Sequence, residues 1–215
     1  MASQTLLDLR GRLRAWSNRK DLPDELLSDF INIAQARLNR LLRIPPLEAD
    51  AILTPSAKGS VRVPRDFLEM IAAWYTDAQG RRVSLDRKDI AYTQELSSGG
   101  NSSPQFFARQ GFDLQLSPVP LDVTSNSVEL YYYASIQPLI ENTDVNWFTE
   151  DAPEVLLYGA LAELSLYLRD EIGAGQWEAK FQNHSREIQN IEDTAMWSGG
   201  TLAINPTTAQ KYRLR

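Results

Sequence analysis

Residues 142–170, "NTDVNWFTEDAPEVLLYGALAELSLYLRD", decide the architecture that the sequence predicts. Pro153 is typical of the first turn of a helix, and residues 155–168 are apolar on almost every side. A helix that is apolar all round has no face for solvent and must be buried. We therefore expect this helix to lie inside a bundle, against other helices of the chain or of a neighbouring copy.

Amphipathic helices at both ends of the chain supply the partners of this bundle. Residues 6–16 place apolar side chains at steps of three and four after Ser3, which is a candidate N-cap, and residues 23–43 form a second helix that starts at Pro23. After a corner at residues 173–175, the last helix carries one apolar stripe made of Trp177, Phe181, His184, Ile188 and Ile191. Each stripe must be buried, so the two ends of the chain are expected to pack together.

The middle of the chain, from about residue 49 to residue 136, changes to a strand pattern. Short helices are expected to interrupt it at residues 64–69 and 86–96. The predicted hairpins are residues 49–64, residues 71–85 with a tip at 77–80, and residues 106–118 with a turn at Gln110 and Gly111, followed by a tyrosine-rich strand at 128–136. The predicted fold class is therefore α+β, a helix bundle built from N- and C-terminal helices with an inserted β-rich region and an extended C-terminal arm.

Charge is divided unevenly along the 215 residues, whose net charge is −6. The predicted parts are residues 1–46 and 141–197 for the bundle, 47–140 for the β-rich insertion and 198–215 for the arm. Residues 141–197 carry a net charge of −9, whereas the arm has three basic residues and no acid. This asymmetry favours charge-guided contact between copies or partners, with solvated faces as the alternative. An acidic chain does not favour general affinity for nucleic acid.

Candidates for catalysis or metal binding are few. The chain has no cysteine, and it lacks phosphate-loop, zincin, nucleophile-elbow and EF-hand motifs. Its one histidine, His184, lies on the apolar stripe, where packing is a better interpretation than a catalytic triad. Three arginines near the N-terminus could contact phosphates, but they alternate with core-type residues and are interpreted as a solvated or subunit-facing surface: Arg10, Arg12 and Arg14.

Four carboxylates stand before the apolar helix, beside the aromatic pair Trp147 and Phe148. Acids at this position offset the unpaired N–H groups and the dipole of a helix start. They could instead bind a metal or form the carboxylate pair of a glycosidase. The four are Asp144, Glu150, Asp151 and Glu154. We expect the helix-start role, and we predict no catalytic residue, no metal site and no cofactor.

The order of the segments resembles the head-to-tail adaptor proteins of tailed bacteriophages, a family that includes tail-tubular and head-completion connectors. The resemblance covers residues 22–191 and is most specific in "VPRDF" (63–67), "FFARQGFDLQLSP" (106–118) and residues 147–168. It implies a ring, usually of 12 copies, that docks under the portal protein and encloses the DNA exit channel. It also implies a C-terminal arm that reaches towards the portal.

The expected function is that of a structural neck protein. It would form a homo-oligomeric ring, bind the portal on one face and a tail or nozzle protein on the other, and let DNA pass without sequence-specific binding. We expect the arm to contact the portal or a neighbouring subunit through Ile204, Lys211, Tyr212, Arg213, Leu214 and Arg215. The expected location is the virion neck, after assembly in the bacterial cytoplasm, with no membrane contact. The alternatives are a carboxylate-pair peptidoglycan hydrolase of the virion and another ring protein, such as a tail terminator.

Overall fold

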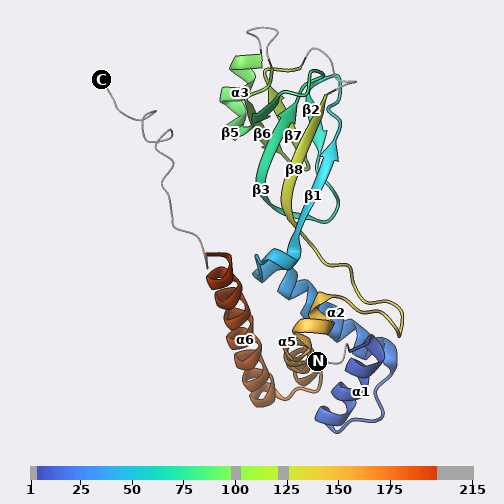
Figure 1. Ribbon diagram of the computed structural model, residues 1–215. Coiled ribbons are helices and arrows are strands. Elements are labelled where there is room, and N and C mark those ends of the chain that lie inside the picture. The colour runs from blue at the N-terminus through green and yellow to red at the C-terminus, as the bar shows by residue number, and fades with distance from the viewer. Residues whose placement is uncertain (1–3, 98–102, 121–125, 198–215) are drawn as a thin grey trace.

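The computed structural model describes residues 4–97, 103–120 and 126–197. Figure 1 shows a helical part and a β part joined end to end, with the helices drawn from both ends of the described chain. The helical part consists of α1 (Leu6–Ser17), α2 (Asp24–Leu41), the 3₁₀ turn η1 (Pro45–Leu47), α4 (Trp147–Asp151), α5 (Pro153–Tyr167) and α6 (Glu171–Trp197). The α+β class and the insertion of strands between helices are therefore confirmed; the exact boundaries of the four predicted parts remain predictions.

Helix α5 is the centre of the helical part, as its apolar sequence predicts. It packs against α2, α6 and α1, and its buried side chains lie on all sides of the helix. The stripe predicted for α6 is only partly correct. Phe181 is fully buried and Trp177 and Ile188 pack against the same core, but Ile191 is 65% exposed. Ile191 stands near the C-terminal end of α6, which has 27 residues against the 15 of α5.

The first helix begins at Thr5, which replaces Ser3 as the observed N-cap. The Thr5 side chain accepts a hydrogen bond from the backbone N–H of Asp8 at 3.3 Å, and the Asp8 carboxylate accepts one from the Thr5 N–H at 3.0 Å. This reciprocal pair is a capping box. Ser3 and Thr5 are both residue types that cap helices. The acid three positions after Thr5, Asp8, is the sequence signal that favours Thr5 as the cap.

The corner between α5 and α6 lies at residues 168–170, and the prediction of residues 173–175 was wrong. Arg169 adopts a left-handed conformation with φ of 61° and turns the chain. The Asp170 carboxylate then accepts a hydrogen bond from the Gly173 N–H at 2.9 Å. This bond satisfies an N–H group that a helix start leaves unpaired, so the two glycines fall inside the first turns of α6.

The β part contains two four-stranded sheets that enclose a second apolar core. One sheet has the order β1-β8-β3-β4 and the other β2-β7-β6-β5. The strands are β1 (Glu48–Leu53), β2 (Ser60–Arg62), β3 (Phe67–Thr76), β4 (Arg82–Ser84), β5 (Asp86–Arg87), β6 (Phe106–Gln110), β7 (Asp113–Ser117) and β8 (Ser127–Ala134), with helix α3 (Ile90–Ser97) between β5 and β6. The helix α3 packs on β6 and β7.

Two of the three predicted hairpins are confirmed, β3–β4 and β6–β7. The third is wrong, because β1 pairs with β8 and β2 pairs with β7 in the other sheet. The helix predicted at residues 64–69 is also wrong, since β3 begins at Phe67. The helix predicted at residues 86–96 begins only at Ile90, after the short strand β5.

Amide side chains of α2 join the helical part to the β part. Asn39 donates to the backbone oxygen of Ile136 at 3.0 Å and accepts from its N–H at 3.1 Å. Asn32 makes the same double contact with Leu139, with both distances at 3.0 Å. These bonds hold the segment that follows β8 along the side of α2, so the direction in which the chain leaves the β part is fixed.

Candidate assembly surfaces

The four carboxylates do not form a shared site. Asp144 accepts hydrogen bonds from the N–H groups of Ile140 and Glu141, both at 2.8 Å. These two backbone bonds hold the pKa of the Asp144 carboxyl below its ordinary value of 3.8. Asp144 therefore stabilises the turn before α4, which is a loop role and not the helix-start role that the sequence suggested.

The sequence predicted the residues at the starts of α4 and α5 only in part. Glu150 and Glu154 stand in the first turns of α4 and α5, as expected, and the exposed Asp151 is the last residue of α4. The cap itself is Asn146, whose side chain accepts from the Thr149 N–H at 3.2 Å. In residues 4–97, 103–120 and 126–197, no group of three or more acids or histidines is placed to hold a metal ion.

The aromatic pair before α5 belongs to the helical core. Phe148 is fully buried, and Trp147 packs edge-on against it with ring centroids 5.3 Å apart. Both rings contact the core around α5. Trp147 and Phe148 thus pack at the start of α4 against the helical core, and they do not form the aromatic cleft that a glycosidase would need.

His184 also has a packing role, as expected. Its ring lies edge-on to Tyr158 with centroids 5.0 Å apart, and its Nδ1 lies 3.0 Å from the backbone oxygen of Lys180. Tyr158 stacks in turn on Trp177, and Trp16 joins them from α1 at 5.7 Å from the Trp177 ring. Trp16 is 48% exposed, so this cluster presents aromatic surface to solvent, although the sequence placed Trp16 in the core.

The arginines of α1 contact other parts of their own subunit. Arg10 is buried and donates to the Ser28 hydroxyl at 2.7 Å and to the Asn142 side chain at 2.6 Å. Arg14 forms an ion pair with Asp24, and Arg12 donates to the Gln4 side chain at 2.9 Å. The expectation of a solvated or subunit-facing arginine surface is thus corrected, because these guanidinium groups already tie α1 to its neighbours.

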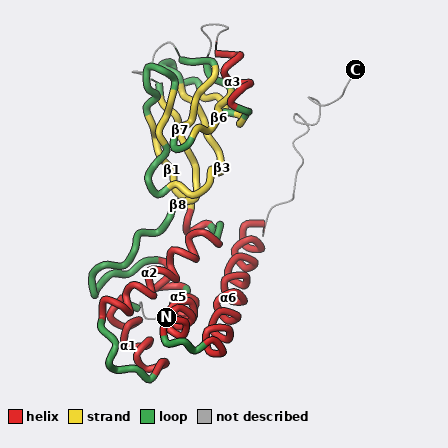
Figure 2. The backbone as a smooth tube through the Cα atoms, turned by 180° about the vertical axis from the view of Figure 1, so that it is seen from behind, coloured by secondary structure: helices red, strands yellow, loops and turns green. Residues whose placement is uncertain are grey.

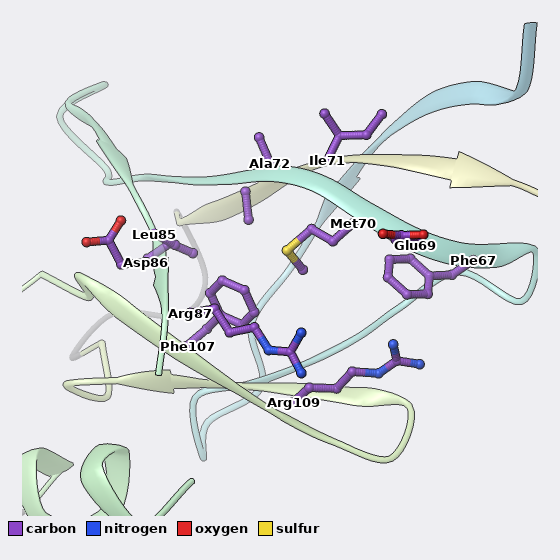
Figure 3. Close-up of a pocket in the computed structure, with 11 residues that line it drawn as sticks. Phe67, Glu69, Met70, Ile71, Ala72, Leu85, Asp86, Arg87, Phe107 and Arg109 are labelled. Carbon is purple, nitrogen blue, oxygen red and sulfur yellow. The ribbon is translucent and has the colours of Figure 1, made fainter. Parts of the chain in front are cut away.

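A cavity of about 330 Å³ opens between the two sheets of the β part. Figure 3 shows Met70 and Phe107 inside it, with the guanidinium groups of Arg87 and Arg109 reaching across the opening. Arg109 donates to the Gly111 backbone oxygen at 3.1 Å. The described part of the chain places no ion-pair partner on Arg87 or Arg109 within 4.0 Å, so the opening carries two guanidinium groups without a paired carboxylate.

The outer face of the β1-β8-β3-β4 sheet is the largest feature that sequence reasoning missed. The helix α3 covers the other sheet, and Figure 2 shows no described helix across β1 and β8. This face exposes Ile52 (74%), Ile71 (45%) and Tyr131 (39%). Antiparallel sheets usually present polar side chains to solvent, so exposed apolar and aromatic residues here indicate a protein contact surface.

Strand β1 forms the edge of that sheet. On one side it pairs with β8 from Glu48↔Tyr133 to Leu53↔Val128, and among the described strands none pairs with its other side. Glu48 and Asp50 point to the outer face, opposite Tyr133 and Tyr131, whereas the intervening alanines point inwards. The alternation was visible in the sequence, but the free edge depends on the sheet topology.

The predicted arm contacts, Ile204 and Lys211 to Arg215, lie outside the described residues. The described helices contain no segment with the length and hydropathy of a membrane span. What the described residues offer is a rigid two-part subunit with exposed apolar, aromatic and charged surfaces and no assembled catalytic group. Such features are typical of a subunit whose function is contact with other proteins.

The family comparison agrees with this class. The model of the SU10 adaptor protein family matches residues 4–205, and the class of protein is therefore that of bacteriophage head-to-tail adaptors. The chain belongs to the SU10 adaptor protein family. Comparison with curated proteins gave no match. Membership in this family implies contact with phage portal and tail proteins and a place in the neck of the virion.

Proposed function

We propose that this protein forms a ring of 12 copies under the portal, where it extends the DNA channel and provides the attachment site for the tail. The observation that carries this proposal is the match to the adaptor family over residues 4–205. The bundle of α1, α2, α5 and α6 would give each copy a rigid body, and the uncovered sheet face would give it a surface for neighbours. A tail or nozzle protein would bind the face of the ring opposite the portal.

Charge supports the channel role. Residues 141–197 carry a net charge of −9, and the α1 arginines are engaged within the subunit. A wall with this charge would not hold the phosphate backbone, so DNA would slide through without sequence-specific binding. Assembly would take place in the cytoplasm of the bacterial host, before the tail joins the filled head.

We further propose that the protein is not an enzyme and needs no cofactor. Asp144 organises a turn, and Glu150 and Glu154 stand at helix starts. These three carboxylates therefore have local structural roles that explain their positions without catalysis. The arm, residues 198–215, would make a contact outside its own subunit, with the portal or an adjacent copy, through Ile204 and the stretch from Lys211 to Arg215.

The decisive experiment measures mass. The purified protein is analysed by native mass spectrometry and light scattering, alone and after mixing with purified rings of the portal protein from the same phage. We expect a complex that contains 12 copies per portal ring. A protein that stays monomeric and unbound in the presence of portal rings would contradict the proposal.

A further inference from the structure

The free edge of β1 has an unusual alternation. Of its six residues, Glu48, Asp50 and Ile52 are exposed on the outer face, and neither acid has an ion-pair partner among the residues that the structure describes. The inward-pointing residues of the same strand, Ala49, Ala51 and Leu53, are only partly buried and pack against the core of the β part. The edge therefore offers unpaired backbone groups, acids on one face and incompletely covered small apolar side chains on the other.

Residues 211–215 have the complementary alternation. Lys211, Arg213 and Arg215 are basic, and the intervening Tyr212 and Leu214 are apolar. In an extended chain, alternate side chains point to opposite faces. A strand formed by these residues would therefore present three cations on one face and two large apolar side chains on the other.

We propose that residues 211–215 of one copy pair with the free edge of β1 in an adjacent copy, as an added strand of its β1-β8-β3-β4 sheet. This assignment rests on the proposed ring and decides which partner the arm contacts. Main-chain hydrogen bonds to an exposed sheet edge supply the affinity, and alternate side chains supply the specificity. Tyr212 and Leu214 would cover Ala49 and Ala51. Two of the three cations would lie beside Glu48 and Asp50, and the third beside Ile52.

In the proposed register between residues 211–215 and β1, the central residue Arg213 lies beside Asp50. With this centre, Tyr212 and Leu214 fall beside Ala49 and Ala51 whether the added strand runs parallel or antiparallel to β1. Opposite charges on neighbouring strands stabilise a sheet, and like charges destabilise it. A shift by one residue would place both tyrosine and leucine on the acidic face, so the alternation selects the register.

Chain length and placement favour an adjacent copy over the same copy. Lys211 lies 14 positions after Trp197, which allows a reach of about 45 Å when the chain is extended. Figures 1 and 2 place α6 on one side of the molecule and β1 on the side of the β part away from it. An arm that leaves one side and an edge that accepts it on the other make a head-to-tail contact, and such a contact generates a ring when the rotation between copies closes.

Cysteine cross-linking tests this pairing directly, because the chain has no cysteine of its own. Full-length Asp50→Cys and Arg213→Cys proteins are mixed in equal amounts, with and without portal rings, oxidised, and run on a non-reducing gel. We expect a covalent dimer from this mixture. The matched control replaces Asp50→Cys by Lys58→Cys, an exposed position in the turn after β1, and should give no dimer.

Charge reversal provides the second readout. We expect Glu48→Lys with Asp50→Lys to lower the yield of rings about tenfold, at an unchanged melting temperature because both side chains are exposed. Arg213→Glu is then added to the same chain, together with Lys211→Glu for a parallel strand or with Arg215→Glu for an antiparallel strand. One of these two combinations should restore the yield. Wild-type rings that form normally while the Asp50–Arg213 dimer is absent would overturn this inference and leave the proposed function intact. Absence of the dimer together with absence of rings would overturn both this inference and the proposed function. In a single chain that carries Asp50→Cys and Arg213→Cys together, an intramolecular disulfide would assign the arm to its own subunit.

Discussion

Gly159 of α5 lies directly against Phe181 of α6. A Cβ atom added to this glycine would lie 2.9 Å from Cδ2 of the phenylalanine ring and 2.8 Å from Cβ of Ala34 in α2. Three helices thus approach each other at one position that has no side chain. The close approach explains why glycine is present in the middle of a helix, where it would otherwise be unfavourable.

Gly159→Ala should therefore destabilise the protein, although alanine is the better helix former. Overpacking of a tight core costs about 1–3 kcal/mol, and the expected change in the free energy of unfolding is in this range. The control is Gly11→Ala in α1, where an added Cβ meets nothing within 4 Å; it should stabilise by up to about 1 kcal/mol. Urea unfolding measures both, and a stabilised Gly159→Ala protein would contradict the packing.

Phe181→Ala should remove the largest fully buried side chain of α6. Phe181 is fully buried, and the guanidinium carbon of Arg37 lies 4.4 Å from its ring centroid. Large-to-small changes at such sites cost about 3–5 kcal/mol. Ile191→Ala, on the same helix but 65% exposed, should change the melting temperature little. Equal effects of the two changes would mean that the far end of α6 is also packed within the subunit.

Asp144→Asn should reveal a pH dependence of stability. Hydrogen bonds from the Ile140 and Glu141 N–H groups depress the pKa of the folded Asp144 carboxyl below 3.8. A depressed pKa means that the stabilisation is present above the unfolded pKa and is lost as the pH falls through the folded value. Wild type should therefore be more stable than Asp144→Asn at pH 7, and the difference should shrink below about pH 4. A difference that is constant between pH 7 and pH 3 would contradict this role.

The purified protein should not cleave peptidoglycan. Glu150 and Glu154 occupy first helical turns, so replacement of either by glutamine is expected to leave no activity to lose. Dye release from labelled cell walls is the measurement, with lysozyme as a positive control. Reproducible cleavage by wild type that disappears in Glu150→Gln or Glu154→Gln would establish the hydrolase alternative.

Truncation after Trp197 should separate folding from assembly. The described helices and both apolar cores lie before this residue, so the melting temperature is expected to stay within a few degrees of wild type. Stable attachment to the portal should be lost, and complemented infections should yield heads that leak DNA or fail to accept tails. Wild-type yields of complete particles from the truncated protein would show that the arm is dispensable.

Local sequence patterns predicted the elements whose partners are close along the chain. The apolar helix after Pro153 and the hairpins at Gly80 and Gly111 were predicted correctly because periodicity and turn residues carry the signal. The corner at Arg169 was misplaced because Asp170 caps the next helix before the glycines can end the previous one. The hydrogen bond from the Gly173 N–H to Asp170 decides between a corner at residues 168–170 and a corner at residues 173–175.

Long-range pairing limited the prediction of the β part and of its surfaces. Nothing near β1 in the sequence indicates that Glu48 pairs with Tyr133 and not with a residue of β2. The acid–alanine alternation of β1 was readable, but an edge is defined by the absence of a second neighbour, which only the sheet order reveals. Of the carboxylates before α5, only Glu150 and Glu154 were interpreted correctly from sequence, because the turn that Asp144 holds together cannot be read from the acid pattern.

The pairing of Glu48 with Tyr133 also places the first and last residues of the β part side by side, as neighbours on adjacent antiparallel strands. The chain therefore enters and leaves the β part at one place beside the helical part. The length of the β part between these two points does not change where the chain returns to the bundle. An engineered chain could omit the β part at these two points, with a short turn that links Leu47 to Ile136, and retain the helical part as an independent unit.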